Sequence, residues 1–84
     1  MNRYMELYKR YIDVVVVQKK DGSMIPIYLY WENGKKYKID KVISKERRVS
    51  KVGGCGIRYS CLIHGYRRNL FFEKDKWFIE SYQP

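Results

Sequence analysis

The chain has 84 residues, of which 45% are hydrophobic and 17% aromatic, and it carries 18 basic against 9 acidic residues. This length supports one domain with a thin core, and the aromatic content excludes a disordered chain. No apolar run approaches the roughly 20 residues that span a bilayer, and the first residues lack the hydrophobic stretch of a signal peptide. We therefore expect a cytoplasmic protein without a membrane partner.

Residues 1–10 are expected to form a lead-in to a single domain that covers residues 11–84. Tyr4, Leu7, Tyr8 and Tyr11 recur at helical spacing and predict one or two helical turns. A segment this short is not a stable helix on its own. A frayed lead-in is therefore the alternative.

The first half of the domain predicts three strands. Residues 11–18 are rich in valine, and residues 24–32 alternate apolar side chains. Pro26 cannot donate to a sheet, so an edge or a bulge is expected there. Asn33-Gly34 predicts a two-residue hairpin with a type I′ turn. The returning strand, residues 35–44, changes phase at Val42 and should contain a bulge or bend.

The second half predicts a loop over residues 45–56 and a strand over residues 57–64. A turn at 65–69, a short strand at 70–73 and a last strand at 77–81 complete the chain. The fold class is therefore mainly β, a single small antiparallel barrel or roll of about five to six strands and of SH3-like size.

Three residues, Cys55, Cys61 and His64, are of the types that form zinc sites or Cys–His nucleophilic pairs. Their spacing lies outside the usual zinc patterns, and a strand places Cys61 and His64 on opposite faces. The cysteines are expected to be free thiols, because a strand would hold them about 20 Å apart. Residues 53–56 could cradle a phosphate, but a flexible turn or bulge is favoured. The sequence predicts a protein that is not an enzyme, with neither cofactor nor metal.

The positive charge is confined to the middle of the chain. Residues 35–68 hold eleven lysines and arginines but only Asp40 and Glu46 as acids, whereas the remaining residues are balanced. Such a cluster attracts polyanions. Tyr28, Tyr30 and Tyr66 are the aromatic residues that we expect to be exposed, and Trp31 and Trp77 are expected to anchor the core.

Several segments resemble a small uncharacterised family of bacterial proteins. They are Tyr11-Ile12-Asp13-Val14, Trp31 with Asn33-Gly34, Gly53-Gly54-Cys55-Gly56-Ile57-Arg58-Tyr59 and Trp77-Phe78-Ile79-Glu80. The resemblance covers nearly all of the chain from Tyr11 onward and implies no catalytic or ligand residues. Similar small domains are associated with genes for lesion-bypass DNA polymerases, which implies a role connected with DNA.

These observations predict a non-enzymatic binding module that contacts nucleic acid, DNA more than RNA, or assists a protein that acts on DNA. The predicted contact residues are Lys36, Lys38, Arg47, Arg48, Lys51, Arg58, Tyr66, Arg67 and Arg68. The alternative is a protein-interaction module that receives an acidic partner on an exposed edge strand or in an aromatic groove.

Overall fold

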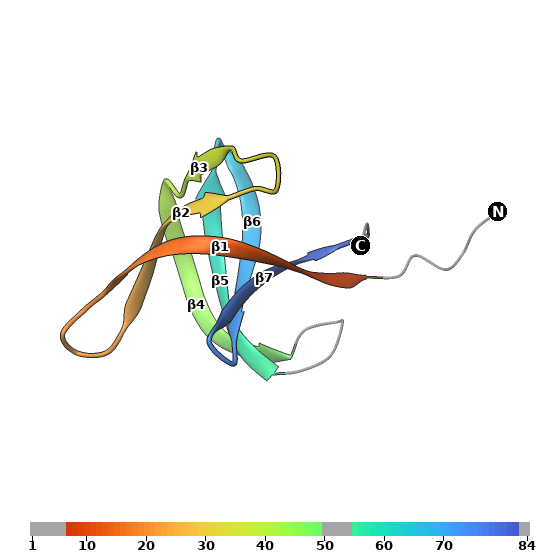
Figure 1. Ribbon diagram of the computed structural model, residues 1–84. Helices are drawn as coiled ribbons and strands as arrows, with labels where there is room; N and C mark the ends of the chain where they lie inside the picture. The colour runs from red at the N-terminus through yellow and green to blue at the C-terminus, as the bar shows by residue number, and fades with distance from the viewer. Residues whose placement is uncertain (1–6, 50–54, 83–84) are drawn as a thin grey trace.

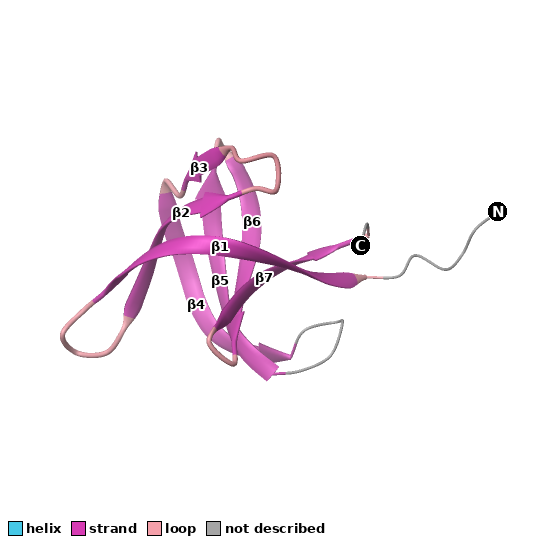
Figure 2. Cartoon of the chain, viewed as in Figure 1, coloured by secondary structure: helices cyan, strands magenta, loops and turns pink. Residues whose placement is uncertain are grey.

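The computed structural model describes residues 7–49 and 55–82, and this part of the chain forms seven antiparallel strands and no helix (Figure 1, Figure 2). The strands are β1 (Tyr8–Gln18), β2 (Met24–Tyr30), β3 (Lys36–Lys38), β4 (Lys41–Val49), β5 (Cys55–Ile63), β6 (Tyr66–Glu73) and β7 (Lys76–Ser81). The predicted antiparallel barrel or roll is confirmed, with seven strands instead of five to six. Within these residues no helix is long and apolar enough to cross a membrane.

The sheet curls because its two outermost strands are consecutive in the chain. The strand order is β3-β2-β1-β7-β6-β5-β4, and only Ile39 and Asp40 separate β3 from β4. The Ile39 N–H donates to the carbonyl of Ile27 on β2, and the Asp40 N–H donates to that of Leu62 on β5, both at 2.8 Å. This link draws the two ends of the sheet together into a half-barrel (Figure 1).

The core fills the concave side of the half-barrel, where alternate residues of the strands meet. Tyr59 and Cys61 of β5 and Leu70 of β6 are at most 1% exposed. Trp77 of β7 packs on Tyr59 with ring centroids 5.0 Å apart. Apolar side chains of β1 and β2 cover this cluster from the opposite wall.

The predicted N-terminal helical turns are wrong for the described residues, because β1 begins at Tyr8. Residues 8–12 pair with residues 77–81 of β7. A helix this short is not stable on its own. Pairing with β7, which is far away in the sequence, stabilises the strand conformation of these residues instead. The prediction for residues 1–6 lies outside the described residues.

Two predicted loops are also strands. Residues 45–49 continue β4 and pair with residues 55–59 of β5. Residues 66–69 begin β6 and pair with residues 60–63 of β5. Residues 45–48 and 67–69 are polar at every position and do not alternate with apolar residues. The sequence therefore looks like a loop, although the backbone is paired along one side.

The tight turns differ from the prediction in their positions. His64 and Gly65, with φ of 51° and 77°, form the two-residue turn between β5 and β6. At Asn33-Gly34 only Gly34 has a positive φ, of 82°. The Gly34 N–H donates to the Trp31 carbonyl and the Trp31 N–H donates to that of Lys35, which makes a longer loop than a type I′ hairpin.

The irregularities expected in the first half of the chain are present. The β1–β2 register shifts between Val15 and Val16, which face Tyr28 and Pro26, so Ile27 is the extra residue of a bulge. The bend expected near Asp40 is a complete break that separates β3 from β4. Pro26 is buried, so the bulge accommodates a residue that has no N–H to donate.

Candidate functional site

The half-barrel is split between β6 and β7. These strands pair only through Phe71–Phe78, Phe72–Trp77 and Glu73–Lys76. Beyond this point residues 66–70 of β6 pair with β5 alone, and residues 79–81 of β7 pair with β1 alone. Among the described strands, none fills the space between them.

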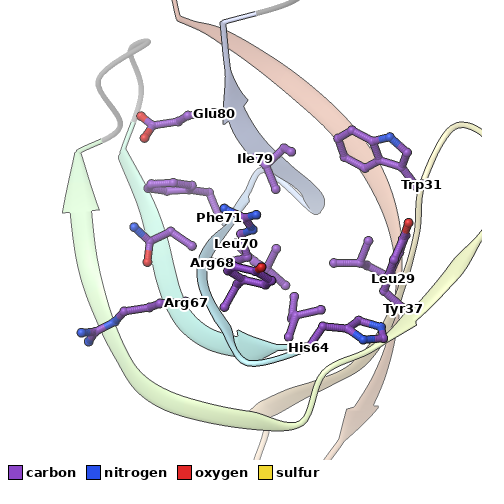
Figure 3. A pocket seen from close by; sticks show the side chains of 13 residues that line it. Leu29, Trp31, Tyr37, His64, Arg67, Arg68, Leu70, Phe71, Ile79 and Glu80 are labelled. Atoms are coloured by element: carbon purple, nitrogen blue, oxygen red, sulfur yellow. The ribbon is translucent and has the colours of Figure 1, made fainter.

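A cavity of about 650 Å³ lies at this split (Figure 3). Six consecutive residues of β6, Tyr66–Phe71, line it. Because successive side chains of a strand point to opposite faces, a lining without alternation means that the cavity reaches the backbone edge of β6. The remaining lining residues are Leu29, Trp31, Tyr37, Ile63, His64, Ile79 and Glu80.

The walls of the cavity combine apolar, aromatic and cationic groups. The guanidinium of Arg68 lies 5.4 Å from the ring centroid of Tyr66, which is 65% exposed. Trp31 of the cavity wall is in turn contacted by Arg10, which is not a lining residue; its guanidinium lies 4.9 Å from the Trp31 ring and also contacts Glu32. Trp31 was predicted to anchor the core; it packs against the core cluster, but it is half-buried and also lines the cavity (Figure 3). Trp77 is a core residue as predicted.

Cys61 and His64 do not form a nucleophilic pair. Cys61 is fully buried on the concave side of β5, and burial raises the pKa of its thiol to about 11. The thiolate is the nucleophilic form, so this group is inert near neutral pH. His64 lies in the exposed turn that follows, with its ring 5.6 Å from that of Tyr37.

The strands divide the predicted contact residues between two faces. Strand alternation from the core residues puts Lys36, Lys38, Arg48, Arg58 and Arg67 on the convex face, and Arg47, Tyr66 and Arg68 on the concave side. The structure brings Tyr66, Arg67 and Arg68 to the cavity, whereas Arg47 and Arg48 point in opposite directions. Lys51 lies outside the described residues.

Two of the convex cations are already paired. Glu46 of β4 contacts Arg58 of β5 and lies 3.2 Å from the Nε of Arg48. These hydrogen bonds, first from Arg48 and then from Arg58, hold the pKa of the Glu46 carboxyl below its usual value. Arg48 and Arg58 are therefore less available to an anionic partner than the sequence suggested.

Four other convex cations, Lys36, Lys38, Lys41 and Arg67, have no carboxylate within ion-pair distance in the described part of the chain. Lys41 and Arg67 flank Leu62 in one cross-strand row, because each pairs in register with it. Sequence reasoning missed Lys41 as a contact residue. The phase change at Val42 indicates an irregularity next to Lys41. It does not show which residues neighbour Lys41, because these depend on the pairing of β4 with β5.

We call Lys36, Lys38, Lys41 and Arg67, together with Tyr28 and Tyr30, the convex basic face. Tyr28 pairs in register with Lys38, and Tyr30 pairs with Lys36. The Nζ of Lys36 lies 4.4 Å from the centroid of the Tyr28 ring. Tyr30 is 39% exposed. Aromatic rings and unpaired cations therefore share the outside of β2 and β3.

Comparison with protein-family models, with curated proteins and with solved structures finds no match for this chain in any of the three. The resemblance to a small bacterial family stays a prediction.

Proposed function

We propose that this protein is a non-enzymatic module that binds nucleic acid, DNA more than RNA, on the convex basic face. The observation that carries the proposal is the placement of the charged segment. Residues 35–68, which hold the entire positive excess of the sequence, make up β3, β4, β5 and the start of β6. The hydrogen bond from the Asp40 N–H to the Leu62 carbonyl ties the link between β3 and β4 to β5. Lys38 and Lys41 stand at the two ends of this link.

The electrostatics of this wall favour a polyanion. Lys36, Lys38, Lys41 and Arg67 lack carboxylate partners among the described residues, so a phosphate backbone would meet cations that need not first break an ion pair. Asp40 is the acid nearest to Lys38 and Lys41 in the sequence, and its carboxylate accepts a hydrogen bond from the His64 N–H at 3.1 Å. Release of counterions from the nucleic acid then drives binding.

The aromatic residues of the face favour single strands. Bases stack on exposed rings for about 1 to 3 kcal/mol each, whereas the stacked bases of a duplex are not available. Tyr30 is exposed and accessible to a base. The ring of Tyr28 is contacted by the ammonium group of Lys36. We therefore expect the protein to bind single-stranded DNA more tightly than duplex DNA. Such a module would assist a protein that acts on single-stranded DNA.

The test is a fluorescence anisotropy titration with single-stranded and duplex oligonucleotides over a range of salt concentrations. The double variant Lys38→Ala/Lys41→Ala removes two cations from the face. It should lower the slope of log affinity against log salt by about 0.7 for each phosphate of a single strand that the variant no longer neutralises. The Tyr30→Ala variant should weaken single-strand binding by about 1 to 3 kcal/mol and leave duplex binding unchanged.

The matched control is Lys19→Ala/Lys20→Ala, which removes the same charge from the turn between β1 and β2 (Figure 1). If this control lowers the slope as much as the Lys38→Ala/Lys41→Ala variant, the attraction is a property of net charge and the proposed face is wrong. If the unaltered protein binds no oligonucleotide at low salt, the nucleic-acid function itself is wrong.

A further inference from the structure

The N-terminal half of β6 offers backbone groups that no described strand takes up. His64 and Gly65 form a two-residue turn, so the flanking pair Ile63 and Tyr66 is hydrogen-bonded across the hairpin. Hydrogen-bonded pairs alternate along an antiparallel ladder. The N–H and C=O groups of Arg67 and Asn69 consequently point away from β5, toward the split.

The next residue of this set is Phe71, which is where β7 begins to pair with β6. The outward-pointing groups of Arg67 and Asn69 thus continue the same ladder without a partner strand among the described residues. The open stretch, residues 66–70, is about 16 Å long at the usual rise of a strand. An unpaired edge of this kind is a template for another extended chain.

The cavity beside this edge is shaped for side chains as well as for a backbone. On the concave side it presents Leu29, Leu70 and Ile79, which suit apolar side chains. At the end near the β5–β6 turn it presents Arg67 and Arg68, on opposite sides of the strand. Glu80 lines the cavity from β7 and repels a carboxylate. An acidic side chain therefore suits the end formed by Arg67 and Arg68.

A second copy of this chain does not fit this description. The formal charge of +9 on each chain opposes self-association, and pairing of two β6 edges would place arginines of one copy beside those of the other. An acidic segment has the complementary charge at the Arg67 end and can still bury apolar residues against Leu70.

We propose that the open edge of β6 binds an extended segment of a partner protein, with acidic residues at the Arg67 end and apolar residues toward Leu70. The segment adds a strand in the split between β6 and β7. Its backbone pairs with Arg67 and Asn69, and alternate side chains enter the cavity. This inference shares Arg67 with the convex basic face, but it rests on the open backbone edge and the cavity at the split, which the nucleic-acid proposal does not use.

The probe is a fluorescein-labelled hexapeptide with blocked ends and the sequence Glu-Val-Glu-Ile-Thr-Val, together with its reverse sequence, because a strand can pair in either direction. One of the two should bind saturably, as followed by anisotropy. Trp31 lines the cavity whereas Trp77 lies in the core, so tryptophan emission should change in the unaltered protein and much less in Trp31→Phe. Replacing both Glu by Lys should weaken binding at least about fivefold, the size of a lost charge-assisted hydrogen bond.

The backbone contribution is tested on the peptide, which avoids any question of protein folding. N-methylation of one set of alternate residues removes the donors that face β6, and methylation of the other set does not. One set should weaken binding at least about tenfold, and the other by less than about twofold. Amide hydrogen exchange should slow at Arg67 and Asn69 when the peptide is bound, with no change at Val15, which lies in the β1–β2 hairpin.

A matched pair of protein variants separates charge from backbone. Arg67→Ala keeps the N–H and loses the guanidinium, whereas Arg67→Pro also loses the N–H at a position whose N–H faces away from β5. Provided that thermal unfolding shows both to be folded, the proline variant should bind the peptide at least about fivefold more weakly than the alanine variant. Equal affinities would overturn the proposal.

Two further results would overturn it. Binding that is indifferent to both methylation sets would mean that the peptide docks by side chains alone. Protection of Arg67 and Asn69 by an oligothymidylate but by neither peptide would assign the split to nucleic acid. Loss of oligonucleotide binding with intact peptide binding would instead refute only the function proposed for the convex basic face.

Discussion

Phe71 of β6 and Phe78 of β7 stack across the two strands, with ring centroids 5.2 Å apart and an angle of 9° between the rings. They are also the last pair in register before β6 and β7 separate. Tyr11 of β1 extends this row with an edge-on contact to Phe78 at 5.8 Å. The aromatic row therefore lies at the point where the closed part of the half-barrel meets the split.

We expect Phe78→Ala to destabilise the fold by about 3 to 5 kcal/mol, because the ring is 1% exposed and its removal leaves a large cavity. Urea unfolding followed by tryptophan fluorescence measures the change. Tyr82→Ala serves as the control, since Tyr82 is 58% exposed and its loss should cost little. A loss below about 1 kcal/mol for Phe78→Ala would show that the stack does not hold the strands together.

Gly56 should not tolerate a side chain. A Cβ built at this position would lie 2.6 Å from the carbonyl oxygen of Phe72 on the neighbouring strand β6. Backbone cannot move aside as a flexible side chain can, so Gly56→Ala should destabilise the protein by about 1 to 3 kcal/mol. The measurement is again urea unfolding. Ser44→Ala, on the exposed edge strand β4, is the comparison that should stay within about 0.5 kcal/mol.

The thiol of Cys61 should react only when the protein unfolds. Burial removes it from solvent and raises its pKa to about 11, so the reactive thiolate is scarce near neutral pH. In a Cys55→Ser background, Ellman's reagent should label Cys61 completely in concentrated guanidinium and very slowly in buffer. Rapid labelling of the native protein would mean that the core around β5 opens readily.

Stability should depend on pH through Glu46. Its carboxyl has a lower pKa in the fold than the reference value of 4.5, because Arg48 and Arg58 donate hydrogen bonds to the ionised form. The resulting stabilisation is present above pH 4.5 and is lost as the pH falls through the folded pKa. The stability difference between the unaltered protein and Glu46→Gln should therefore shrink between neutral pH and about pH 3. Urea unfolding at both pH values would contradict this if the difference stayed constant.

The sequence alone was sufficient for features that depend on neighbouring residues. Valine-rich and alternating segments predicted a β fold, Pro26 predicted the irregularity in β2, and the phase change at Val42 predicted the break after β3. Each of these follows from local backbone and side-chain preferences, which act over a few residues.

Only the tertiary structure decided which strands pair and where the pairing stops. β1 pairs with β7 from the other end of the chain, so residues 8–11 form a strand where a helical turn was expected. The same pairing draws β7 away from β6 and opens the split beside Arg67 and Asn69. The division of the basic residues between two faces, and the use of Arg48 and Arg58 by Glu46, depend on the register of β4 with β5. Register is set by contacts between distant residues, and no local pattern in this sequence encodes it.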